Sequence, residues 1–209
     1  MINILIADDH AIVRRGLKQI VAEEPDMTVA GEAKTAQQVL DLVRKQQWDV
    51  VILDITMPGR SGLEVLKELK QERPKLPVLM LSMHPEEQFA VRALKAGAAG
   101  YLTKESAPEE LVTALRKVLR GGKYVSPALA EKLAFALATA SDRPPHETLS
   151  DREYEVLRLI ASGKTVSEIA EQLSLSVKTI STYRTRVLEK MNLKNNAELM
   201  QYAVTHRLV

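Results

Sequence analysis

The sequence of 209 residues contains no cysteine, so it can form neither a disulfide framework nor a thiolate metal site. Aromatic residues make up only 4% of the chain, whereas hydrophobic residues make up 45%, which is enough for packed cores built mainly from aliphatic side chains. The four histidines are scattered, and none stands at zinc-ligand spacing from another. These absences argue against disulfide-stabilised folds and the common zinc sites.

Long apolar runs are also missing. No stretch approaches the roughly 20 apolar residues that a membrane-spanning helix needs, and the first residues show neither a basic leader nor a cleavage site. We therefore expect a cytoplasmic protein without a membrane partner. The net charge is only +2 at pH 7, so affinity for nucleic acid must come from local clusters of basic residues.

Short apolar runs alternate with amphipathic segments through the first 120 residues. The expected strands are 2–7, 27–32, 49–54, 77–82 and 99–102. The expected helices are one with Ile12, Val13, Leu17, Ile20 and Val21 on its inward stripe, and then 36–46, 62–72, 86–95 and 108–120. Five βα units in a row predict an α/β doubly wound parallel sheet with helices on both faces. The flavodoxin-like strand order 2-1-3-4-5 fits this length best.

Polar residues stand where these strands end. Asp8 and Asp9 follow the first strand, and Asp54 ends the third. Ser82 ends the fourth strand, and Lys104 follows the fifth. Because the carboxyl ends of parallel strands share one edge of a sheet, we expect these five side chains to meet at one site.

The residue types at this edge indicate phosphoryl chemistry. Three carboxylates repel one another unless a hard cation lies between them, and Mg²⁺ suits oxygen ligands. We expect the three aspartates and the carbonyl oxygen of Thr56 to bind Mg²⁺. Asp54 would then be the nucleophile that accepts a phosphoryl group, while Ser82 and Lys104 would bind its oxygens. No glycine-rich phosphate loop opens the first helix, so nucleotide binding of the usual kind is not supported.

Residues 1–120 resemble the receiver domain of two-component response regulators. The resemblance is carried by Asp8-Asp9, Asp54 with Met57-Pro58-Gly59, Ser82, and Tyr101 three residues before Lys104. It implies that Ser82 moves toward the phosphoryl group and that Tyr101 turns inward with it, which repacks the face of the fourth helix, fifth strand and fifth helix. Tyr101 is equally compatible with an ordinary aromatic residue of a strand. Glu105 stands where many receivers have proline, so the geometry of that loop is open.

A connection is expected after the Gly121-Gly122 pair. Ser126 and Pro127 would cap and begin a helix over 128–138. Residues 140–146 are polar and interrupted by two prolines, which is typical of a flexible linker. The predicted domains are thus a phosphoacceptor domain at 1–122, a linker with a helix at 123–147, and a second domain at 148–209.

The last sixty residues are expected to form an all-α domain. Capping boxes pair Ser150 with Glu153 and Thr165 with Glu168 at the starts of two helices. A short turn leads to a longer helix over 177–191, and a last helix follows Asn195. Two helices joined by a short turn, the second long and basic, predict a helix-turn-helix. Hydroxyl groups and the lack of acidic residues in the first half of helix 177–191 suit contact with DNA phosphates and bases.

Residues 149–205 resemble the LuxR-type DNA-binding domain of the NarL/FixJ regulators. The shared motif is Leu-Ser-x-Arg-Glu from Leu149, Ile169-Ala170, and Val177-Lys178-Thr179-Ile180-Ser181-Thr182-Tyr183. The resemblance implies that helix 177–191 enters the major groove and that the last helix pairs two copies. The residues expected to contact DNA are Lys178, Thr179, Ser181, Thr182, Tyr183, Arg184, Thr185, Arg186 and Lys190. The residues expected to face bases are Ser181, Thr182 and Thr185, and those expected to hold phosphates are Lys178, Arg184, Arg186 and Lys190.

These observations predict a response regulator transcription factor rather than an enzyme. A sensor histidine kinase would phosphorylate Asp54 in a Mg²⁺-dependent reaction, which would shift dimerisation or interdomain contacts. A homodimer would then bind a roughly two-fold-symmetric site in double-stranded DNA. Two alternatives are a Mg²⁺-dependent phosphatase with an aspartyl intermediate, which needs a second carboxylate where Thr56 stands, and a regulator that acts without phosphorylation.

Overall fold

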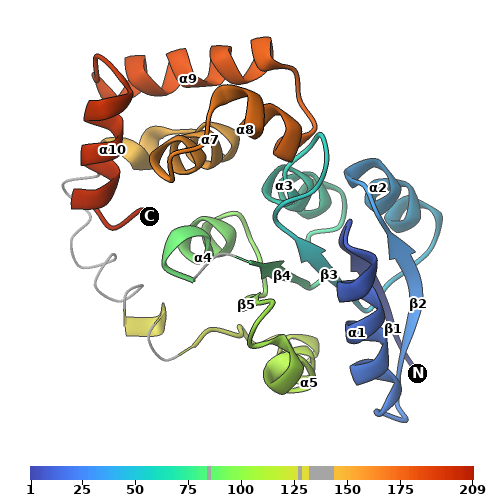
Figure 1. Cartoon of the computed structure of the whole chain (residues 1–209). Coiled ribbons are helices and arrows are strands. Elements are labelled where there is room, and N and C mark those ends of the chain that lie inside the picture. Colours follow the sequence, from blue (N-terminus) through green and yellow to red (C-terminus); the bar gives the residue numbers. More distant parts are fainter. Residues whose placement is uncertain (84–85, 127–128, 132–143) are drawn as a thin grey trace. The chain divides into compact units, whose positions relative to one another are not determined.

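The computed structural model describes residues 1–83, 86–126, 129–131 and 144–209 (Figure 1). The chain divides into two compact units, residues 1–135 and 136–209. Residues 129–131 are helical, and the rest of the helix expected over 128–138 lies outside the described residues. Within the described part of the chain, no helix is both long enough and apolar enough to span a bilayer.

Unit 1 is built on a five-stranded parallel sheet with the order β2-β1-β3-β4-β5, which confirms the predicted topology. Its strands are β1 (Ile2–Ala7), β2 (Met27–Ala33), β3 (Val50–Asp54), β4 (Val78–Ser82) and β5 (Gly100–Thr103). Every residue of β3 and β4 is buried, as expected of central strands that are covered on both faces.

Five helices cover this sheet. They are α1 (Ala11–Ala22), α2 (Ala36–Lys45), α3 (Gly62–Glu72), α4 (Glu86–Lys95) and α5 (Ala107–Leu119). Helices α1 and α5 lie on one face, and α2, α3 and α4 lie on the other (Figure 1). A capping box between Ser61 and Glu64 begins α3. A Cβ at Gly62 would stand 1.9 Å from the Asp54 carbonyl oxygen, so only glycine lets α3 begin this close to the end of β3.

The buried face of helix α1 differs in part from the expected one. Four members of the stripe are buried or partly buried, namely Val13, Leu17, Ile20 and Val21. The fifth, Ile12, is 82% exposed, so that part of the prediction is wrong, and Arg14 is 5% exposed instead. The Arg14 guanidinium donates to the carbonyl oxygens of Asp8 and Asp9 at 2.8 and 3.2 Å, and its Nε donates to Glu32. These charge-assisted bonds offset the cost of burying the cation.

Residues 144–209, the described part of unit 2, contain a short 3₁₀ helix and four α-helices. They are η1 (Pro145–Thr148), α7 (Asp151–Ala161), α8 (Val166–Leu173), α9 (Val177–Met191) and α10 (Asn196–Thr205). Both predicted capping boxes are present. Helix α7 contacts α8, α9 and α10, and its Val156, Leu157 and Ile160 are buried. The other three helices contribute the buried residues Ile169, Leu173, Ile180, Val187, Leu199 and Ala203.

The end of the predicted flexible linker is ordered. Pro145 and His146 begin the 3₁₀ helix η1, which was not expected. The Nδ1 atom of His146 lies 2.9 Å from the hydroxyl oxygen of Tyr202 on α10, and this bond ties η1 to the core of unit 2. Residues 140–143 lie outside the described part of the chain.

Candidate functional site

Three aspartates meet at the carboxyl edge of the sheet. Strands β1 and β3 pair directly, with Ala7 opposite Leu53, so Asp8 and Asp54 continue two neighbouring strands. One oxygen from each of Asp8, Asp9 and Asp54, and one ring nitrogen of His10, all lie within 4.8 Å of one another. Asp8 and Asp54 are almost fully buried. The topology therefore places like charges together where solvent cannot screen them.

Lys104 reaches the same cluster from the fifth strand. Its Nζ lies 2.8 Å from Asp8 Oδ2 and 2.7 Å from Asp54 Oδ2, and its side chain is only 6% exposed. The backbone N–H of Lys104 donates to the Ser82 carbonyl oxygen at 2.7 Å. Glu105 does not keep the lysine from the site, since Lys104 contacts both Asp8 and Asp54. In the same turn the Ser106 N–H donates to Thr103 Oγ1.

Ser82 and Thr56 border the cluster. Ser82 is fully buried and ends β4, one residue beyond Leu81, which lies opposite Asp54 in the sheet. The Thr56 N–H donates to Asp54 Oδ1 at 3.1 Å. The structure thus brings the predicted residues to one edge of the sheet. That the Thr56 carbonyl oxygen binds Mg²⁺ stays a prediction.

His10 was missed as a member of the site. Its Nδ1 lies 2.7 Å from Asp9 Oδ1 and 3.3 Å from Asp8 Oδ1, and its backbone N–H donates to Asp8 Oδ1. The sequence held a signal, since His10 directly follows the two aspartates that end β1. The spacing typical of zinc ligands relates a histidine to other histidines, so it does not detect a histidine beside two aspartates.

The electrostatics of the cluster favour a bound cation. The pKa of Asp54 is raised to about 7, mainly by burial and also by the charge of Asp8, while Lys104 and the Thr56 N–H act to lower it. Burial opposes the charge on Lys104, but the facing carboxylates outweigh this and hold its pKa above the ordinary value. Asp8 Oδ2, near Lys104 Nζ, and Asp9 Oδ1, near His10 Nδ1, are buried, yet neither oxygen accepts a hydrogen bond of good geometry. Such oxygens fit a hard divalent ion.

The raised pKa of Asp54 predicts a loss of stability with rising pH. Between about pH 4 and pH 7 the folded protein keeps a proton on Asp54 that the unfolded chain, with a pKa near 3.8, releases. The free energy of unfolding therefore falls over this range, by at most about 4 kcal/mol at about 1.4 kcal/mol per pKa unit. Urea unfolding of the wild type and of Asp54→Asn at several pH values, each in EDTA, measures this fall in the free energy of unfolding.

The expected difference is a flatter pH profile for Asp54→Asn, because all other titrating groups are common to both proteins. Mg²⁺ should flatten the wild-type profile as well, since a bound cation lowers the pKa of Asp54. Parallel profiles for the two proteins in EDTA would show that Asp54 titrates normally.

Tyr101 lies inward in this structure. It belongs to β5, lies opposite Met80 of β4 and has no exposed surface. This is the orientation that the resemblance assigns to the phosphorylated state, and it is also that of an ordinary core aromatic. The switch role of Tyr101 stays a prediction.

Unit 2 presents the polar face of α9. Ser174 ends α8 in the left-handed conformation (φ 52°), and the Ser176 hydroxyl oxygen accepts from the Thr179 N–H to begin α9. The exposed residues of the predicted DNA contact are Lys178, Ser181, Thr182, Thr185, Arg186 and Lys190, and the partly buried ones are Thr179, Tyr183 and Arg184. This arrangement leaves hydroxyl and basic groups accessible along one helix.

Two residues expected to hold phosphates have partners within unit 2. The Lys190 Nζ lies 2.6 Å from Glu153 Oε2, and the Arg184 Nε donates to Asn196 Oδ1 at 2.6 Å. Lys178 and Arg186 have no ion-pair or hydrogen-bond partner for their side chains among the described residues. They are therefore the cations on α9 with the most freedom to meet an anion.

An α/β unit with an acidic carboxyl edge, followed by a helix-turn-helix, defines a receiver-type regulator. Residues 4–116 match the family model of the response regulator receiver domain, and residues 147–203 match that of bacterial regulatory proteins of the luxR family. The chain belongs to the response regulators, and among them to the NarL/FixJ family.

Full-length relatives agree with this assignment. Response regulator UvrY of Escherichia coli K12 is 36% identical over 209 residues, which cover 100% of this chain and 96% of UvrY. Response regulator GacA of Pseudomonas aeruginosa is 38% identical over 210 residues, covering 100% of this chain and 98% of GacA. RcsB of Salmonella enterica serovar Typhimurium, solved bound to the rprA promoter with phosphomimetic BeF₃⁻, is 30% identical with a TM-score of 0.66. That match covers 97% of this chain and 98% of RcsB.

Proposed function

We propose that the chain is a transcription regulator switched by phosphorylation of Asp54. A sensor histidine kinase would supply the phosphoryl group. The observation that carries this proposal is the contact of Asp54 with Lys104, beside Asp8 and Asp9, at a buried edge of the sheet. Phosphoryl transfer needs charge neutralisation and positioning more than further covalent chemistry, and this edge supplies both.

Each residue of the edge has a task in this proposal. Asp8, Asp9 and Asp54, with the Thr56 carbonyl oxygen, would hold Mg²⁺, which when bound supplies positive charge beside the phosphoryl oxygens. Lys104 and Ser82 would bind those oxygens. The Lys104 ammonium already lies 2.7 Å from Asp54 Oδ2, so it needs only a small movement to meet a phosphoryl group there. The cation also keeps Asp54 ionised, which a nucleophilic carboxylate requires.

Unit 2 would bind double-stranded DNA through α9. Support comes from its exposed basic and hydroxyl side chains and from RcsB, whose structure was solved on a promoter. We propose that two copies pair through α10 and place their α9 helices in successive major grooves. A cytoplasmic location and the domain boundaries at 122 and 148 stay predictions.

Lys178→Ala should weaken binding to all DNA sequences alike. Lys178 is exposed near the start of α9, where its ammonium would meet a phosphate. Losing one phosphate contact should reduce the slope of log K against log salt by about 0.9. Fluorescence anisotropy at several salt concentrations, on one specific and one unrelated duplex, measures this.

The matched control is Lys45→Ala, which removes the same charge from an exposed position of α2 in unit 1. Its salt slope should equal that of the wild type. A loss with Lys178→Ala that is confined to one base position would contradict the phosphate role and indicate direct reading of a base.

Genome-wide footprinting with and without a phosphodonor tests the function as a whole. With phosphodonor, more promoters should be occupied, or each should be occupied more fully. The reason is that phosphorylation would shift an existing equilibrium toward the form that binds DNA. Turnover of generic phosphate esters in Mg²⁺ would instead favour the phosphatase alternative. We expect none, since Thr56 offers no second carboxylate.

A further inference from the structure

A second cavity lies at the opposite edge of the same sheet. Its volume is about 750 Å³, within the range of roughly 300–1,000 Å³ typical of small-molecule sites. It is lined at the amino ends of β3 and β4, where Asp49 and Pro77 stand, whereas Asp54 and Ser82 occupy the carboxyl ends of those strands. The two sites therefore belong to opposite edges of unit 1.

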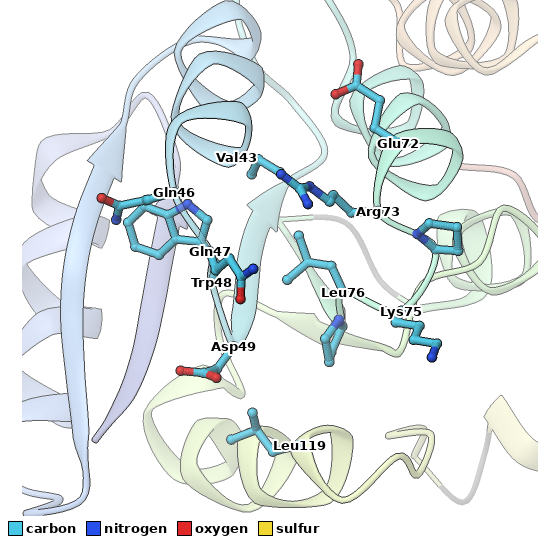
Figure 2. Close-up of a pocket in the computed structure, with 12 residues that line it drawn as sticks. Val43, Gln46, Gln47, Trp48, Asp49, Glu72, Arg73, Lys75, Leu76 and Leu119 are labelled. Atoms are coloured by element: carbon cyan, nitrogen blue, oxygen red, sulfur yellow. The ribbon is translucent and has the colours of Figure 1, made fainter.

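The apolar part of the cavity wall is held in place by hydrogen bonds and close packing. Trp48 is 8% exposed, and its indole N–H donates to the Leu42 carbonyl oxygen at 3.0 Å. The ring packs on Gly31 of β2, where an added Cβ would stand 2.4 Å from it. Leu76 is held by its carbonyl oxygen, which accepts from the Lys70 Nζ at 2.5 Å. Figure 2 shows Trp48 and Leu76 on opposite sides of the cavity.

Two carboxylates, Asp49 and Glu72, and two cations, Arg73 and Lys75, line the cavity, and one of the carboxylates is already paired outside this set. The Glu72 carboxylate is held by the Arg44 guanidinium, and Asp49 Oδ2 accepts from the Asn3 N–H at 2.7 Å. The Arg73 side chain has no hydrogen-bond or ion-pair partner among the described residues. Figure 2 shows Arg73 reaching from the α3–β4 connection toward Val43, while Glu72 points away. Arg73 thus lies at the cavity with its charge felt by Glu72 but, within the described part of the chain, with no ion pair or hydrogen bond that occupies its guanidinium.

We propose that this cavity binds a small aromatic carboxylate, with its ring against Trp48 and its carboxylate on Arg73. A guanidinium binds a carboxylate in bidentate fashion, and an indole gains most from contact with another aromatic ring. The neighbouring Asp49 and Glu72 carboxylates disfavour a doubly charged phosphate. Because the walls are already ordered, the ligand would enter a cavity that needs no rearrangement.

Trp48 provides a direct test, because it is the only tryptophan of the chain. Titration of the full chain with phenylacetate should change its fluorescence to a saturating value. Phenylacetamide, which lacks the charge, and acetate, which lacks the ring, should need about tenfold higher concentrations or more. If bound phenylacetate leaves the fluorescence unchanged, calorimetric titration with the same three compounds measures their binding instead.

Arg73→Gln should raise the Kd for phenylacetate about tenfold, as expected for loss of a charge-assisted hydrogen bond. The matched control is Arg15→Gln, at an exposed position of α1, which should bind like the wild type. Asp54→Asn should also bind normally, so this proposal can fail or hold independently of the phosphorylation switch. Absence of saturable binding, equal affinity for phenylacetamide, or an unchanged Kd in Arg73→Gln would each overturn it.

Discussion

Asp54→Asn should gain no mass when it is incubated with acetyl phosphate and Mg²⁺, whereas the wild type gains one phosphoryl group. The amide of asparagine has no oxygen nucleophile comparable to a carboxylate, so the reaction loses its acceptor. Asparagine has nearly the same shape as the buried Asp54, although its amide can accept from only one of the two donors, Lys104 and the Thr56 N–H, that hold the carboxylate. Intact-protein mass spectrometry measures the effect.

The matched control is Asp41→Asn, an exposed aspartate of α2 that should gain mass like the wild type. DNA affinity and dimerisation, measured in parallel, should respond to acetyl phosphate in the wild type and in Asp41→Asn only. If the wild type gains no mass and Asp54→Asn binds DNA and dimerises as the wild type does, the alternative of a regulator that acts unphosphorylated is the correct one.

Lys104→Met should destabilise the protein by about 3 kcal/mol near pH 8 without Mg²⁺. Methionine fills a similar volume but leaves Asp8 and Asp54 buried without the cation that lies 2.8 and 2.7 Å from them. Removing one partner of a buried ion pair costs about 3–5 kcal/mol, because a charge is left uncompensated. Urea denaturation in EDTA measures the difference from the wild type.

The loss should shrink as the pH falls. Without Lys104 the pKa of Asp54 rises above its present value of about 7, so protonation removes the uncompensated charge at lower pH. The double variant Lys104→Met with Asp54→Asn should recover part of the stability, which a double-mutant cycle resolves. A loss below about 1 kcal/mol, as for exposed ion pairs, would mean that the edge is open to solvent.

The element order was predictable because its causes are local. Apolar runs and turn residues placed all five strands within one or two residues, and α3, α4 and α9 have the predicted bounds. The capping boxes at Ser150 and Thr165 were equally visible, since each joins residues three positions apart. Parallel connections and right-handed crossovers then left few possible topologies, and the predicted strand order is the one found.

The sequence by itself thus determined which residues stand at the carboxyl edge, namely Asp8, Asp9, Asp54, Ser82 and Lys104. Only the tertiary structure decided what each one contacts. It buried Arg14 in place of Ile12, added His10 to the aspartates, and set Lys104 between Asp8 and Asp54. It also formed the open cavity beside Trp48 from segments far apart in the chain. Such contacts depend on how segments distant in the sequence pack together. Hydrophobic periodicity and capping motifs are local patterns, so they do not predict these contacts.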